Sequence, residues 1–295
     1  MQSVATWLVA RPQNAVLALA ATLLLPLLQF FSGVLMVMLV LRQGARLAAI
    51  EGALAATVLM AVSLIVGAPV VHVLDSVLIT WVPALMLAVI LQSTRSLTLT
   101  FQVSSILAVI AVLAFHVIVD DVVAFWQAPV AMLLEWAREN NLREQAELLT
   151  ADPQATANMM MLAVVLTRWT IYSVFLLVGY MLFRQLPDET GRYGRFCDLN
   201  FGRVIAITLA LTSVLAFATG IVWIQNIAVV FFAVFWLQGL AIVHWLYIDG
   251  HLPLFVVIAT YLLMLVLHVF LFSALAVLGY TDAWFRYRRR ATKQQ

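Results

Sequence analysis

An arginine in the middle of a long apolar run is the residue in this sequence that most needs a chemical explanation. Residues 157–183 are mostly apolar and, as a helix, would extend roughly 40 Å. Arg168 lies more than two helical turns from either end of that run. An unpaired arginine near the centre of a bilayer costs about 2.5–3.5 kcal/mol on insertion scales. Arg168 therefore requires a carboxylate, a ligand, backbone carbonyls or water near its guanidinium group.

The residues around Arg168 are polar or amphipathic, among them Thr167, Trp169 and Tyr172. Ionisable residues inside a membrane mark binding sites or pathways by default. The sequence thus predicts a central polar pocket in which Arg168, Trp169 and Tyr172 bind an anionic or amphipathic ligand. The alternative is a structural ion pair, for example with Glu51, that holds no ligand. Glu51 also lies close enough to Arg46 to pair locally or to reach the headgroups.

Gln238 and His244 form a second polar group near the predicted cytoplasmic end of their segment. We include both in the predicted ligand-binding set, although a lone histidine is usually satisfied by a backbone carbonyl. The histidines show no HExxH spacing and Cys197 is the only cysteine, so we expect no metal site. No nucleotide-binding fingerprint or catalytic constellation is present, so we expect no cofactor and no enzymatic activity.

Charged and aromatic residues gather at the C-terminus. Asp282 can pair with Arg286 four residues later, and Trp284 is suited to the headgroup region. Basic residues including Arg286 and Arg288 suit an anionic lipid surface. We therefore predict a basic cytoplasmic tail over residues 282–295, with Asp282, Trp284, Arg286 and Arg288 at a partner or lipid interface.

The composition excludes a soluble globular protein. Hydrophobic residues make up 65% of the 295 residues, charged residues only 10%, and the mean hydropathy is +1.05. Soluble domains carry about a quarter charged residues. We expect an all-α polytopic membrane bundle that forms a single transmembrane domain over residues 1–295. The expected partners are the lipid bilayer and either a membrane protein or a small-molecule ligand. The net charge of +2 is concentrated in the tail, so we expect no nucleic-acid partner.

Reading the sequence against a span of about 20 residues gives eight apolar segments. They cover residues 14–41, 45–67, 76–92, 98–119, 157–183, 203–219, 225–246 and 253–280. The positive-inside rule places the arginines between these segments in the cytoplasm, and the six central segments satisfy it as simple crossings. The second segment also carries small residues every four positions, which favour close helix packing. They are Ala45, Ala49 and Ala53 on one face, and Ala48, Gly52 and Ala56 on another.

The two end segments do not fit simple crossings. A single crossing by residues 253–280 would place the arginine-rich tail outside, so we expect a break near His268 and Ser273. Pro26 lies in the middle of residues 14–41, where proline kinks or breaks a helix. We predict that both segments are kinked or re-entrant. The alternative is seven or eight tilted single crossings with one violation of the charge rule.

An acidic connection over residues 120–152 separates the two halves of the chain. Apolar residues at helical spacing predict a short amphipathic helix between Pro129 and Leu149, lying on the outer membrane surface. It is either a structural connection or a lid over an outward pocket. Asp152 followed by Pro153 predicts the start of the next helix, with a capping carboxylate and proline at the first position.

Several stretches carry a resemblance to a known family. The sequence LGYTDAWFRYRRR, from Leu278 to Arg290, resembles the C-terminal signature of the YybS-like family of predicted bacterial inner-membrane proteins. WVPALMLAVILQSTRSL from Trp81 to Leu97, LTRW from Leu166 to Trp169 and LQGLAIVH from Leu237 to His244 are similar to its proteobacterial branch.

This resemblance implies a distant likeness in organisation to substrate-capture subunits of energy-coupling-factor vitamin transporters and to a rod-shape morphogenesis subunit. It raises an expectation of function without naming a substrate. Our leading hypothesis is therefore membrane transport or small-molecule capture. The alternative is a noncatalytic membrane scaffold that recruits envelope or division partners.

Overall fold

The structure is a computed structural model that describes residues 2–25, 28–186 and 193–288. These residues form α-helices and one short 3-10 helix, with no strand among them. Seven of the described helices are long and apolar enough to cross a membrane. They are α4 (Ala45–Val66), α5 (Val70–Thr94), α6 (Leu97–Ile118), α9 (Pro153–Phe183), α10 (Gly202–Thr219), α11 (Val222–Ile248) and α13 (His268–Phe285). The predicted all-α polytopic bundle is confirmed.

The chain divides into two compact packing units. The first contains Met1–Gln102 and Thr170–Leu199, and the second contains Val103–Trp169 and Asn200–Gln295. Helices α6 and α9 each contribute one part to either unit. The single transmembrane domain expected over residues 1–295 stays a prediction.

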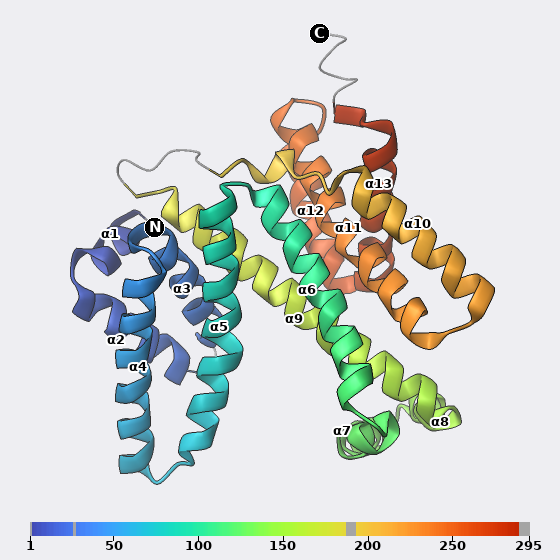
Figure 1. The fold of residues 1–295 in the computed structure, drawn as a ribbon, viewed down its shortest axis with the longest axis horizontal. Coiled ribbons are helices and arrows are strands. Elements are labelled where there is room, and N and C mark those ends of the chain that lie inside the picture. The colour runs from blue at the N-terminus through green and yellow to red at the C-terminus, as the bar shows by residue number, and fades with distance from the viewer. Residues whose placement is uncertain (1, 26–27, 187–192, 289–295) are drawn as a thin grey trace. The chain divides into compact units, whose positions relative to one another are not determined.

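Helix α3 (Gln29–Gln43) is the core of the first unit, since every residue from Ser32 to Leu41 is buried. It packs against α2 (Pro12–Leu24), α4 and α5, and α1 (Gln2–Ala10) packs on α2, as the blue and cyan part of Figure 1 shows. The indole Nε1 of Trp81 donates to Ser32 Oγ at 2.7 Å and so ties α5 to α3.

Two glycines allow α9 to approach α3 closely. A Cβ atom at Gly33 would lie 2.3 Å from the ring of Phe175, and one at Gly179 would lie 2.8 Å from the carbonyl oxygen of Val34. Real Cβ atoms do not approach neighbours so closely. This is the small-residue packing that brings membrane helices together.

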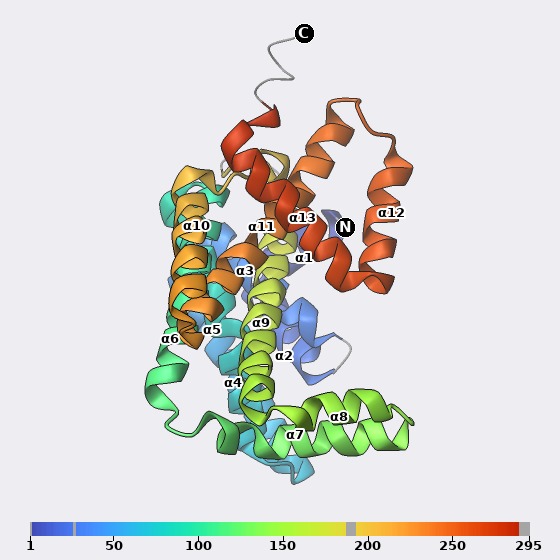
Figure 2. The same cartoon turned by 90° about the vertical axis from the view of Figure 1, so that its right-hand side faces the viewer.

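Helix α11 is the core of the second unit and is buried along most of its length. It packs against α10, α12 (Leu254–Val266) and α13, as Figure 2 shows. The same unit contains α7 (Val122–Glu139) and α8 (Arg143–Ala151), which pack on each other.

Both end segments are broken, as predicted. Helix α2 ends at Leu24 and α3 begins at Gln29, and the two pack together as a hairpin; Pro26 lies outside the described residues. Helix α12 ends at Val266 and α13 begins at His268, so the break falls beside His268. The part of the prediction that named Ser273 is wrong, because Ser273 lies inside α13. Figure 2 shows α12 and α13 as the two arms of a hairpin.

The connection between α6 and α9 holds two helices, where the sequence predicted one short helix beginning at Pro129. Helix α7 begins earlier, at Val122, because the Asp121 carboxylate caps it by accepting from Ala124 N at 2.9 Å. The predicted cap at Asp152 is confirmed, since its Oδ1 accepts from the backbone N–H of Ala155 at 2.9 Å.

Candidate functional site

Arg168 lies midway along α9, and its side chain is exposed. Val164, one turn earlier, and the adjacent Thr167 are exposed as well, so Arg168 belongs to an uncovered part of the helix surface. Within the described part of its own unit it forms no hydrogen bond or ion pair. The guanidinium charge of Arg168 is thus not neutralised by a described residue of the second unit. The ligand-binding role of Arg168 stays a prediction.

The aromatic neighbours of Arg168 have structural contacts of their own. Trp169 is 6% exposed, and its Nε1 donates to Ser104 Oγ on α6 at 3.1 Å. The hydroxyl of Tyr172 donates to the carbonyl oxygen of Ile79 on α5 at 2.9 Å. Both side chains therefore help to hold α9 to neighbouring helices, and their predicted ligand roles stay untested.

Gln238 lies at the centre of a buried polar network in the second unit. Its amide oxygen accepts from the backbone N–H of Phe201, which precedes α10, at 2.7 Å. Its amide nitrogen donates to Asp282 Oδ2 on α13 at 3.0 Å. Gln238 is 0% exposed and Asp282 is 1% exposed, so both sit in the interior of the unit.

The ion pair of Asp282 is with Arg288, where the sequence predicted Arg286. Arg288 Nη2 donates to Asp282 Oδ2 at 2.8 Å. The physical reason is that α13 ends at Phe285 and Arg286 adopts a left-handed backbone, with φ of 52°. Helical spacing therefore no longer applies at Arg286, and the chain turns so that Arg288 reaches back to the carboxylate.

The burial of the Asp282–Arg288 ion pair affects the partner or lipid interface that the sequence predicted at the C-terminus. Asp282 is buried and the side chain of Arg288 is 11% exposed, so this conformation presents little of either to a partner. Trp284 and Arg286 are exposed and remain accessible. The interface role of these residues stays a prediction. Sequence reasoning missed the contact between Gln238 and Asp282 because the two residues are 44 positions apart on different helices.

Two glycines beside the network set the distance between α11 and α13. A Cβ atom at Gly239 would lie 2.0 Å from the carbonyl oxygen of Leu275, and one at Gly279 would lie 2.2 Å from that of Phe235. The backbones of the two helices are therefore in direct contact. This contact brings the short side chains of Gln238 and Asp282 within hydrogen-bonding distance.

His244 belongs to a different contact. Its Nδ1 lies 2.9 Å from the carbonyl oxygen of Leu240, which can only accept, so Nδ1 carries the proton. In the neutral ring Nε2 is then an acceptor, and the Tyr261 hydroxyl on α12 lies 3.2 Å from it. The structure thus joins Gln238 to α13 and His244 to α12, and supports the interpretation that a backbone carbonyl satisfies the histidine.

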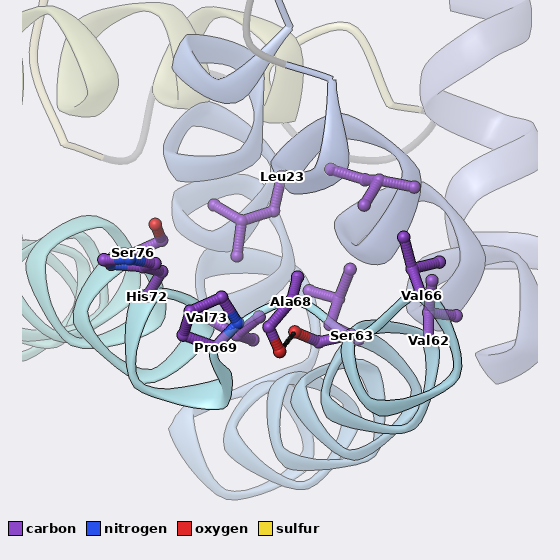
Figure 3. A pocket seen from close by; sticks show the side chains of 11 residues that line it. Leu23, Val62, Ser63, Val66, Ala68, Pro69, His72, Val73 and Ser76 are labelled. Atoms are coloured by element: carbon purple, nitrogen blue, oxygen red, sulfur yellow. Dashed lines mark hydrogen bonds between the residues drawn. The ribbon is translucent and has the colours of Figure 1, made fainter.

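A cavity of about 270 Å³ lies in the first unit between α2, α4 and α5 (Figure 3). The sequence alone did not indicate it, because its walls come from three separate helices. Apolar side chains form most of the lining, with a histidine and two serines among them. The lining residues are Leu23, Leu24, Leu59, Val62, Ser63, Val66, Ala68, Pro69, His72, Val73 and Ser76.

Cys197 lies in the short 3-10 helix that follows α9 in the described chain, outside the spanning helices. Burial raises the pKa of its thiol, and the negative charge of the neighbouring Asp198 raises it further. The thiol is thus a weak nucleophile at neutral pH. The described residues contain no cluster of metal-ligating side chains that includes it.

Comparison with known proteins gives one match. The family model of predicted membrane proteins called DUF2232 matches residues 14–283. No curated protein and no solved structure matches the chain. The matched range contains all seven candidate spanning helices except the last two residues of α13, together with the Gln238 and Asp282 network. The chain therefore belongs to the DUF2232 family of predicted membrane proteins.

Proposed function

We propose that this membrane protein captures or transports a small anionic or amphipathic molecule, and that Arg168 binds the charged group of that molecule. The observation that carries the proposal is the exposed guanidinium group midway along a spanning helix. The resemblance to capture subunits of vitamin transporters supports the same class of function. A bacterial inner membrane and a cytoplasmic C-terminus are part of this proposal.

The physical argument concerns depth. The 31 residues of α9 extend about 46 Å, and the hydrocarbon core of a bilayer is about 30 Å thick. A residue midway along that helix therefore lies inside the hydrocarbon. Retaining an unpaired arginine there costs about 2.5–3.5 kcal/mol. A bound anionic group would offset this cost, which gives the ligand a strong preference for this position.

The test is native mass spectrometry of the protein extracted gently from its own membrane. We expect the wild type to retain a small molecule that Arg168→Gln loses, because glutamine keeps much of the length but not the charge. Arg138→Gln on α7 is the matched control, since Arg138 is exposed but lies outside the spanning helices. Equal retention by the wild type and Arg168→Gln would contradict the proposal.

One observation favours the alternative, a noncatalytic scaffold for envelope or division partners. Of the two small-residue faces of α4, the one with Ala48 and Gly52 is buried inside the unit, whereas Ala49 and Ala53 are exposed. An uncovered small-residue face is suited to close packing by another membrane helix. A protein that co-purifies with the wild type and is lost on Ala49→Leu, without any bound small molecule, would support the scaffold.

A further inference from the structure

The cavity of Figure 3 exists because one helical hairpin of the first unit is shorter than the other. Helices α2 and α3 have 13 and 15 residues, so they extend about 20 Å and 22 Å. Helices α4 and α5 have 22 and 25 residues and extend about 33 Å and 37 Å. In Figure 1 the α4–α5 hairpin continues beyond the end of α2 and the start of α3. The cavity lies where the end of α2 meets the far turns of α4 and α5.

The inner wall of this cavity is apolar. Leu23 and Leu59 are 8% and 4% exposed, and both face the cavity. The Ser63 hydroxyl in the same wall donates to the carbonyl oxygen of Ala68 at 3.0 Å, so it is already satisfied. The inner part of the cavity therefore offers ordered water no free polar group to bond, and such an apolar region stays dry. Its natural occupant is a hydrocarbon.

The cavity opens toward the surface that a bilayer would cover. Val66 lines it and is 74% exposed, and the neighbouring Ile65 is 85% exposed. Apolar side chains so exposed on a spanning helix face lipid. Hydrocarbon can therefore enter the cavity directly from the membrane.

One end of the cavity is polar. His72 and Ser76 lie one turn apart on α5, and their side chains form no hydrogen bond with other described residues. Figure 3 shows both at one end of the cavity, opposite Val62 and Val66. Because α5 begins at Val70, this polar end lies in its first two turns, where acyl chains join their headgroups.

We propose that this cavity binds one acyl chain of a bilayer phospholipid, whose ester or headgroup oxygens hydrogen-bond to His72 and Ser76. The volume of about 270 Å³ lies just below the roughly 300–1,000 Å³ of pockets for drug-sized ligands, which suits a single chain. Arg46 lies in the first turn of α4, whereas the cavity lies near the C-terminal end of that helix. The lipid therefore belongs to the leaflet opposite the one that contains Arg46. This site goes beyond the proposed function and does not depend on Arg168.

The test uses a phosphatidylglycerol with a diazirine in one acyl chain, mixed into phosphatidylethanolamine vesicles that contain the full-length protein. We expect photolabelling of the cavity wall at Leu59, Val62 or Val73, located by peptide mass spectrometry. Val62→Trp fills the cavity and should reduce this labelling about tenfold. Leu64→Trp is the matched control, because Leu64 is 69% exposed and does not line the cavity.

The polar end is tested separately. His72→Phe and Ser76→Ala each remove a hydrogen bond and should weaken labelling about threefold to tenfold, whereas His72→Gln should retain most of it. Arg168→Gln should leave labelling unchanged, which separates this site from the proposed function. Thermal melting identifies any variant that fails to fold, and Val73→Phe then replaces Val62→Trp as the filling variant.

Two results would overturn the proposal. One is phospholipid labelling of the cavity wall that neither filling variant reduces. The other is labelling of the wall by a free diazirine fatty acid while the phospholipid probe does not label it, which would make the site one for free amphiphiles.

Discussion

Asp282 is the least exposed charged residue among those that the structure describes, at 1%. Its Oδ2 accepts from both Gln238 and Arg288, while Oδ1 is buried without a partner among the described residues. Removing one partner of a buried pair is costly because an uncompensated charge remains in a region of low dielectric constant. The carboxylate therefore stabilises the end of α13 only while Arg288 remains in place.

At the residue scale, we predict that Asp282→Ala lowers the free energy of unfolding by about 3–5 kcal/mol, because the Arg288 side chain, only 11% exposed, loses its counter-charge. Asp282→Asn should cost less, since an amide oxygen can still accept from Gln238. Unfolding in mixed micelles, followed by tryptophan fluorescence, measures both effects.

The exposed pair between Arg195 and Asp198 supplies the control for this prediction. Its atoms are also 2.8 Å apart, but the side chains are 59% and 50% exposed. Asp198→Ala should therefore cost at most about 1 kcal/mol. If Asp282→Ala costs no more than Asp198→Ala, the buried network does not stabilise the protein.

At the scale of the element, the second unit depends on the direct backbone contact between α11 and α13. Gly239 and Gly279 face carbonyl oxygens of the opposite helix, so neither position has space for a side chain. Helices in a membrane gain little from burying apolar surface, because lipid tails are equally apolar. Close van der Waals packing and the Gln238 hydrogen bond must then hold this pair together.

We predict that Gly279→Val separates α11 from α13 and destabilises the protein by about 1–3 kcal/mol or more, as overpacking does. Ala274→Val on the exposed face of the same helix should have little effect. The comparison uses the same unfolding assay. Equal stability of the two variants would show that the helices can move apart at no cost.

The α12–α13 hairpin decides the topology of the whole molecule. Helix α12 has 13 residues and extends about 20 Å, which is shorter than the hydrocarbon core of about 30 Å. Because α13 runs back from its tip, the tail returns to the side where α11 ends. We therefore expect Arg286 and the loop after α11 to lie on the same side of the membrane, which is the arrangement that the positive-inside rule predicts.

At the scale of the whole molecule, we predict from which side of the membrane single cysteines react in intact vesicles. Each cysteine is introduced into a variant that lacks the native Cys197. Ser96→Cys, Asp249→Cys and Arg286→Cys should react from one side of the membrane. Asn140→Cys and Thr219→Cys should react from the other. Labelling of Arg286→Cys from the same side as Asn140→Cys would show that the α12–α13 hairpin crosses the membrane and does not bring the chain back to the side where α11 ends.

The sequence alone determined the class of the protein and the two end segments that are broken. Apolar composition and run length are local properties, and they predicted the polytopic helical bundle. The charge rule predicted that the last segment breaks, near His268 and Ser273, because a straight segment would have placed the tail on the wrong side; the break lies beside His268. The Asp152 cap was equally local, since it involves only residues three positions apart.

Only the tertiary structure decided which polar groups meet. Helical spacing predicted a pair between Asp282 and Arg286, but α13 ends between them and Arg288 takes the place of Arg286. The contacts of Gln238 with Phe201 and Asp282, and the cavity between α2, α4 and α5, join residues that are far apart in the chain. Nearly uniform apolar helices carry little information about which faces pack together. Close packing through glycine and the length mismatch between hairpins supply that information, and both exist only in the folded chain.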